Sequence, residues 1–154
     1  MTLTTISGLP AHVLLVHALV VLVPLTALLE VLCAVWPAAR RHLVWLVLAL
    51  AAVTTGLTPI TANAGEWFYD QQHGHRAILD THATLGSAMI YYSIALLAVA
   101  VVLGVVHRRE VRAVIPRRAV SVAIAVFAIV VGVAATVQIV RIGDSGARAV
   151  WSSD

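Results

Sequence analysis

The 154-residue sequence contains one cysteine, no lysine and few charged residues of either sign. A single cysteine, Cys33, excludes an intramolecular disulfide framework and a thiolate-rich metal site. Charged residues make up 11% of the chain and hydrophobic residues 61%, against roughly 25% and 45–50% in typical soluble domains. All ten basic residues are arginines in short clusters between apolar runs, which indicates membrane topology rather than nucleic-acid binding. The composition therefore predicts an integral membrane protein whose surroundings are the lipid bilayer, with no nucleic-acid partner.

Four apolar runs are each long enough to cross a membrane. The hydrocarbon core is about 30 Å thick and requires about 20 apolar residues in a helix. The sequence predicts spanning helices at about residues 10–36, 43–62, 81–107 and 119–142. Short connections favour antiparallel neighbours. We therefore expect an all-α fold, a four-transmembrane-helix antiparallel bundle, in which residues 1–154 form a single integral membrane domain of a multi-pass plasma-membrane protein.

The placement of arginine orients this bundle. Seven of the ten arginines lie in the connections after the first and third predicted helices, and such clusters mark the cytoplasmic side. We therefore expect the 107–118 connection to be cytoplasmic, and both termini and the 63–81 loop to lie outside the cytoplasm. Glu30 lies near the cytoplasmic end of the first helix, where we expect its carboxylate to extend towards Arg40 or Arg41.

Histidines and acidic residues gather at the opposite end of the bundle. Lipid makes ionisable groups costly, so those within or beside the spans are candidates for function. His17 lies about two turns inside the first helix and His82 begins the third, so we expect their imidazoles to approach each other across the bundle. His12 lies about 140° from His17 around a helix, which argues against a side-by-side clamp of these two. The other candidates at this end are Glu66, Arg141 and Asp144.

Several segments resemble one bacterial family. They are Gly-Leu-Pro-Ala-His-Val-Leu-Leu-Val-His-Ala at 8–18, Ala64-Gly65-Glu66, the stretch 82–86, and Arg-Ile-Gly-Asp-Ser-Gly-Ala at 141–147. Together they resemble a large uncharacterised family of small four-helix predicted membrane proteins, a domain of unknown function, and its actinobacterial branch most strongly. The resemblance covers nearly the whole chain. It implies a shared site at the outer face and suggests haem.

Two kinds of cofactor fit these residues. Haem b, in an electron-transfer protein, requires two histidines on facing helices, for which we expect His17 and His82, with Arg141 pairing with the propionates. The alternative is zinc, iron or copper held by nitrogen and oxygen ligands. The ligand set would then come from His12, His17, His82, Glu66 and Asp144.

The third possibility needs no cofactor. The chain would then be an accessory or structural subunit of a respiratory or other membrane complex, or would form a homodimer, with its polar residues joining helices. No sequence motif assigns a reaction, so the sequence leaves open whether the protein is an enzyme. We also expect the segment after Arg141 to be ordered and to fold over the outer mouth of the bundle, with Asp144 near the histidines.

The orientation is testable by labelling. Cysteines placed in the 63–81 loop should react with a membrane-impermeant thiol reagent added to intact cells, because arginine counting puts this loop outside the cytoplasm. Cysteines placed in the 107–118 connection should react only after the cells are opened. Labelling of the second set in intact cells would mean that the bundle is inverted.

Overall fold

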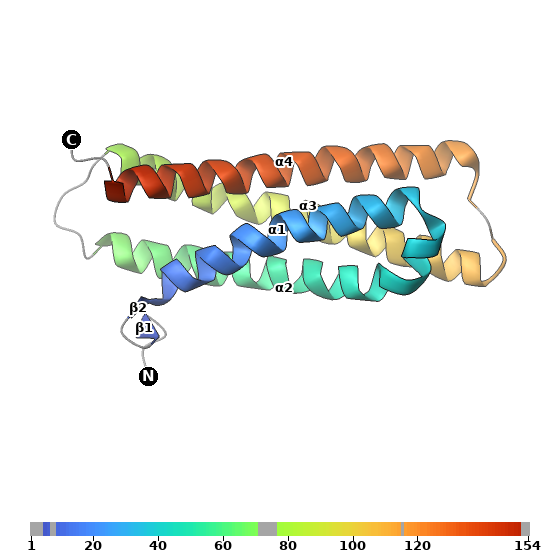
Figure 1. Ribbon diagram of the computed structural model, residues 1–154, viewed down its shortest axis with the longest axis horizontal. Coiled ribbons are helices and arrows are strands. Elements are labelled where there is room, and N and C mark those ends of the chain that lie inside the picture. Colours follow the sequence, from blue (N-terminus) through green and yellow to red (C-terminus); the bar gives the residue numbers. More distant parts are fainter. Residues whose placement is uncertain (1–4, 7–8, 71–76, 115, 152–154) are drawn as a thin grey trace.

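Four long helices account for nearly all of the residues that the computed structural model describes, which are 5–6, 9–70, 77–114 and 116–151. Two paired two-residue strands, β1 (Thr5–Ile6) and β2 (Leu9–Pro10), precede them. The helices are α1 (Ala11–Val35), α2 (Pro37–Asp70), α3 (Ala77–Val111) and α4 (Arg118–Trp151) (Figure 1). Each is long and apolar enough to cross a membrane. The predicted all-α, four-helix, multi-pass membrane fold is thereby confirmed.

The helices form an antiparallel bundle. α1 and α3 each pack against both α2 and α4, with weaker contact across the α1–α3 diagonal. α1 begins and α4 ends at the same end of the long axis (Figure 1). We name this the histidine end, because His12 and His82 lie there, and the other the arginine end, because it carries the α1–α2 and α3–α4 connections and Arg40. Which end faces the cytoplasm stays a prediction.

The helices are longer than the apolar runs that identified them. α2 and α4 each contain 34 residues, or about 51 Å at 1.5 Å per residue, against a hydrocarbon thickness of about 30 Å. Their ends therefore extend into the polar boundary of the membrane. The segment from Arg141 continues α4 to Trp151 as one helix, so the expectation that it folds over the mouth is wrong. Its helical hydrogen bonds already satisfy the backbone there.

The connection between α1 and α2 is a single residue, Trp36. Pro37 begins α2, where its missing N–H costs no hydrogen bond. Proline also disfavours helical geometry at the residue before it, which ends α1 at Val35. This sharp turn brings the start of α2, with Arg40, directly against the end of α1.

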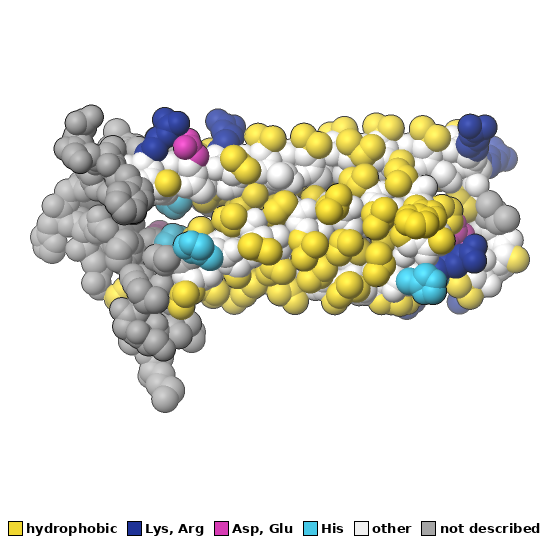
Figure 2. All heavy atoms as spheres, viewed as in Figure 1, with side chains coloured by type: hydrophobic (Ala, Val, Ile, Leu, Met, Phe, Trp, Pro, Cys, Tyr) yellow, Lys and Arg dark blue, Asp and Glu magenta, His cyan; other side chains and the backbone are white. Residues whose placement is uncertain are grey.

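Apolar side chains cover the middle of the bundle, and charged groups lie at its two ends (Figure 2). Exposed valines such as Val130, Val133 and Val140 follow the surface of α4, as expected where lipid is the solvent. The buried core divides into two groups. The arginine-end cluster contains Cys33, Ala34, Val44, Val47, Ala51, Val99, Ala100, Leu103 and Ala128. The histidine-end cluster contains Leu19, Val23, Ala27, Met89, Leu96, Ala135, Ile139 and Ile142.

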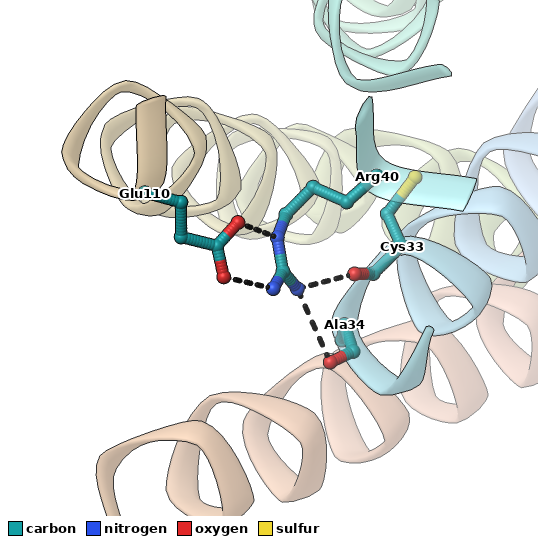
Figure 3. A network of polar contacts seen from close by, with 4 residues as sticks. All are labelled: Cys33, Ala34, Arg40 and Glu110. Atoms are coloured by element: carbon teal, nitrogen blue, oxygen red, sulfur yellow. Dashed lines mark hydrogen bonds and ion pairs between the residues drawn. The ribbon is translucent and has the colours of Figure 1, made fainter. Parts of the chain in front are cut away.

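A buried ion pair joins three helices at the arginine end. Arg40 of α2 donates from Nη2 and Nε to the two carboxylate oxygens of Glu110 of α3, at 2.6 and 3.1 Å (Figure 3). Its Nη1 donates to the carbonyl oxygens of Cys33 and Ala34 at 2.6 and 3.4 Å. The guanidinium therefore also caps the C-terminus of α1. The expected contact of Glu30 with Arg40 or Arg41 is wrong, because neither oxygen of Glu30 has a hydrogen-bond partner.

Removing this ion pair should destabilise the bundle strongly. The Arg40 side chain is 6% exposed and that of Glu110 22%, so removing the carboxylate leaves a buried guanidinium without its counter-ion, which costs up to about 3 kcal/mol. Glu110→Gln should lower the free energy of unfolding by roughly that amount, measured by chemical denaturation in detergent.

The matched control for Glu110→Gln is Asp144→Asn, which removes the exposed ion pair of Asp144 with Arg148. Exposed pairs four residues apart on a helix contribute about 0.5 kcal/mol or less. Equal effects of the two substitutions would contradict a special role for the buried pair.

Candidate functional site

Two histidines meet at the histidine end of the bundle. The rings of His12 of α1 and His82 of α3 lie edge to face, with their centroids 6.2 Å apart. His12 Nδ1 lies 2.9 Å from the carbonyl oxygen of Thr61 in α2. His82 Nδ1 lies 2.9 Å from the Ser145 hydroxyl in α4. All four helices are therefore joined through two imidazoles.

The partners of the two Nδ1 atoms determine which nitrogen carries hydrogen. A carbonyl oxygen only accepts, so His12 donates from Nδ1 to Thr61. The Ser145 hydroxyl donates to the Ile142 carbonyl at 2.9 Å, and its oxygen therefore accepts from His82 Nδ1. When neutral, both rings carry hydrogen on Nδ1 and a lone pair on Nε2. Nε2 is thus the atom of each ring that can take up a further proton.

Two glycines provide the space for these rings. A Cβ at Gly65 of α2 would lie 2.7 Å from His12 Cε1, and one at Gly146 of α4 would lie 3.1 Å from His82 Cε1. Carbon atoms in contact are normally about 3.5–4.0 Å apart. The absence of a side chain at both positions therefore lets the imidazoles lie directly against the backbones of α2 and α4.

A small cavity of about 40 Å³ lies beside the pair. Its polar lining comes from the two histidines, Thr58 and Thr61, while apolar side chains form most of the rest, among them Leu19, Met89 and Ile142. This volume is enough for a few water molecules. It is far below the roughly 300–1,000 Å³ of sites for drug-sized ligands. The chemistry available here is proton uptake and hydrogen bonding to water.

The other site residues predicted from the sequence do not line this cavity. His17 is exposed on α1, so the structure places His12 beside His82 instead. Glu66 and Arg141 are exposed on α2 and α4. Asp144 is also exposed and forms an ion pair with Arg148, at 3.0 Å. The 140° that separates His12 from His17 around a helix explains why only one of them faces the bundle interior.

The comparison with protein families matches residues 8–154 to a family described as predicted membrane protein DUF2231. The chain belongs to this DUF2231 family. No curated protein and no solved structure matches it. Family membership establishes a membrane protein of a group without assigned function, and it covers both histidines and the whole bundle.

The expectation that this DUF2231 protein binds haem b, or alternatively zinc, iron or copper, is wrong. Within residues 5–6, 9–70, 77–114 and 116–151, no group of three or more histidine, cysteine or acidic side chains could hold a metal ion. Two imidazoles come together, but the predicted third ligands, Glu66 and Asp144, are exposed. The cavity beside the rings is also too small for a porphyrin.

Sequence reasoning missed the groups that hold the two imidazoles. The sequence did not identify the partners of the rings, which are Thr61, Gly65, Ser145 and Gly146. Ser145 and Gly146 were expected in a tail that folds over the bundle. One signal was available. Ile142, Ser145 and Gly146 have the three-and-four spacing of one helix face, which indicates that α4 continues and presents this face to α3.

The two close approaches can be tested with matched glycine substitutions in the same helices. Gly65→Ala and Gly146→Ala should destabilise the protein and displace the rings of His12 and His82, because each new methyl group meets an imidazole. Gly56→Ala in α2 and Gly143→Ala in α4 have nothing within 4 Å of the new Cβ. Alanine favours a helix over glycine by up to about 1 kcal/mol, so these two should be neutral or stabilising.

The measurements are the denaturation midpoint in detergent and the histidine ring signals in NMR spectra. If Gly65→Ala behaves like Gly56→Ala in both, the rings do not rest against the glycine backbones.

Proposed function

We propose that this protein is a proton-responsive accessory component of the membrane. The observation that carries the proposal is the junction of His12 and His82, in which two imidazoles from α1 and α3 are hydrogen-bonded to α2 and α4. Histidine is the side chain that most readily gains and loses a proton near neutral pH. The junction of all four helices therefore depends on groups whose charge changes with pH.

Electrostatics supports a change of structure on acidification. Two unit charges 6.2 Å apart, the separation of the ring centroids, repel by about 3 kcal/mol at an effective dielectric constant of about 20. The first proton that binds to the pair meets no such repulsion, whereas the second proton does. A charged ring keeps its Nδ1 hydrogen, so both Nδ1 hydrogen bonds persist on protonation. The repulsion therefore acts mainly between the two helices that carry the rings, α1 and α3. Separation of α1 from α3 at the histidine end relieves it.

The described carboxylates around this junction lie at the periphery. Asp144 of α4 is paired with Arg148, while Glu66 of α2 and Asp80 of α3 are exposed. On α1, His17 is a further titratable group and is also exposed. Because these carboxylates are in contact with water and salt, they compensate a positive charge on the two rings only weakly. The repulsion between the two imidazoles is therefore the dominant change when both are protonated.

The size of the cavity favours an accessory role over catalysis. A space of about 40 Å³ admits water and protons but no metabolite of ordinary size. A bundle that opens at one end changes the surface it presents within the membrane. A membrane complex or a second copy of this chain is the partner that would detect this change. With the orientation predicted from arginine, the protein responds to protons outside the cytoplasm.

Spin-label distances provide the test. Labels at Leu14→Cys and Thr84→Cys, both exposed at the histidine end of α1 and α3, in a Cys33→Ala background report the α1–α3 separation in lipid nanodiscs. The distance distribution should lengthen between about pH 8 and about pH 4, because the repulsion between the rings moves the second protonation below the usual range of histidine. His82→Gln should abolish the change, because the amide takes up no proton.

The control pair is Arg41→Cys with Val111→Cys, exposed on α2 and α3 at the arginine end, whose distance should not change with pH. An unchanged Leu14–Thr84 distance in the protein with both histidines intact would refute the proposal. A change that persists in His82→Gln would refute the assignment to this pair.

A further inference from the structure

A second polar feature lies inside the bundle, on α1. Glu30 lies between Ala27, the last α1 member of the histidine-end cluster, and Cys33 of the arginine-end cluster, and Thr26 lies one turn before Glu30. Both side chains are 0% exposed, as is that of Thr54 on α2. We name Thr26 and Glu30 the buried polar layer.

The polar layer has unmet hydrogen-bonding capacity. Both carboxyl oxygens of Glu30 and the hydroxyl oxygens of Thr26 and Thr54 are buried without a hydrogen-bond partner among the described residues. Buried polar atoms in folded proteins almost always have a partner in protein or ordered water. Thr26 and Glu30 are four residues apart and therefore lie on the same face of α1. Each of these oxygens can hydrogen-bond to water that enters the bundle.

Arg40, the cation nearest to Glu30 along the chain, does not neutralise it. Arg40 directs Nε and Nη2 to Glu110 and Nη1 to the carbonyl groups of Cys33 and Ala34 (Figure 3). Its ion pair within the described residues is with Glu110. An ionised carboxylate buried without a cation or hydrogen-bond donor is far more costly than the neutral acid. Glu30 therefore favours the carboxylic acid form in this conformation.

The other ionisable groups do not change this conclusion. On α1 the neighbouring one is Cys33, which is neutral as a thiol. α2 has none between His42 and Glu66, α3 has only Tyr91 and Tyr92 between His82 and His107, and α4 has none between Arg118 and Arg141. Beyond Arg40 and Glu110, which neutralise each other, no charged side chain is available along these stretches to hold Glu30 ionised.

We propose that Glu30 is a proton-binding site inside the membrane, which exchanges its proton with water that Thr26 binds one helical turn away. The ligand is a proton, which the carboxylate takes from water and returns to it, with no other bond made or broken. The site lies on the opposite side of the histidine-end cluster from the imidazole pair. It does not depend on the function proposed for that pair.

Infrared spectroscopy of the purified full-length protein tests the proposal. At neutral pH the wild type should show the C=O stretching band of a protonated carboxyl group, and Glu30→Gln should lose it. Glu66→Gln, which changes an exposed carboxylate, should retain the band. In D₂O the band should shift, and at alkaline pH it should be replaced by carboxylate bands, because the proton exchanges with water.

Substitutions distinguish proton binding from a structural role. Glu30→Met removes the buried acid at similar volume, so its denaturation midpoint should equal or exceed that of the wild type. Thr26→Val should leave the band present but move it to higher wavenumber, because a carboxylic acid with fewer hydrogen bonds has a stiffer C=O bond.

Several results would overturn the inference. If the wild type has no acid band and Glu30→Gln loses carboxylate intensity, Glu30 is ionised. If the band survives in Glu30→Gln, the proton belongs to another residue. If the band in the wild type changes neither in D₂O nor at alkaline pH, the proton does not exchange and Glu30 is a structural acid. The wild-type measurements decide this point even if the variants fold poorly.

Discussion

Hydrocarbon offers no hydrogen-bond partner, and the architecture of this protein depends on that constraint. Every backbone group inside the membrane must be satisfied within the chain, which only helices and closed barrels achieve. The four helices meet this requirement and continue beyond the apolar core, with no break between Arg118 and Trp151. Lipid-facing positions need only be apolar, so valine and alanine suffice there. Specificity must therefore come from the few polar side chains in the bundle.

These polar side chains join helices at both ends. At the arginine end, one guanidinium connects α2 to Glu110 of α3 and to the last carbonyl groups of α1. At the histidine end, His12 and His82 connect α1 to α2 and α3 to α4. In each junction the atoms that link the helices are hydrogen-bonded to named partners, which lowers the cost of burying them. The two junctions differ in chemistry, because one joins two opposite charges and the other joins two rings that can each take up a proton.

The buried polar layer differs from both junctions, because its oxygen atoms have no partner. An apolar side chain of similar volume at Glu30 would pack without this cost. Sites that lower stability in this way are commonly those that function requires. On the two proposals made above, the protein would take up protons at two separate depths, at an imidazole pair near one end and at a carboxyl group between the two apolar clusters.

The sequence alone determined the number of spans, the fold class and the end at which histidines gather, because apolar run length and composition depend on local residue type. It also identified His12 and His82 as candidates. Only the tertiary structure decided which residues meet. Helix rotation turned His17 outward and His12 inward, and long-range packing paired Arg40 with Glu110 rather than with Glu30. It also brought Gly65 and Gly146 against the rings. Helix rotation and contacts between distant residues are set by the packing of all four helices together, which no single segment of the sequence specifies.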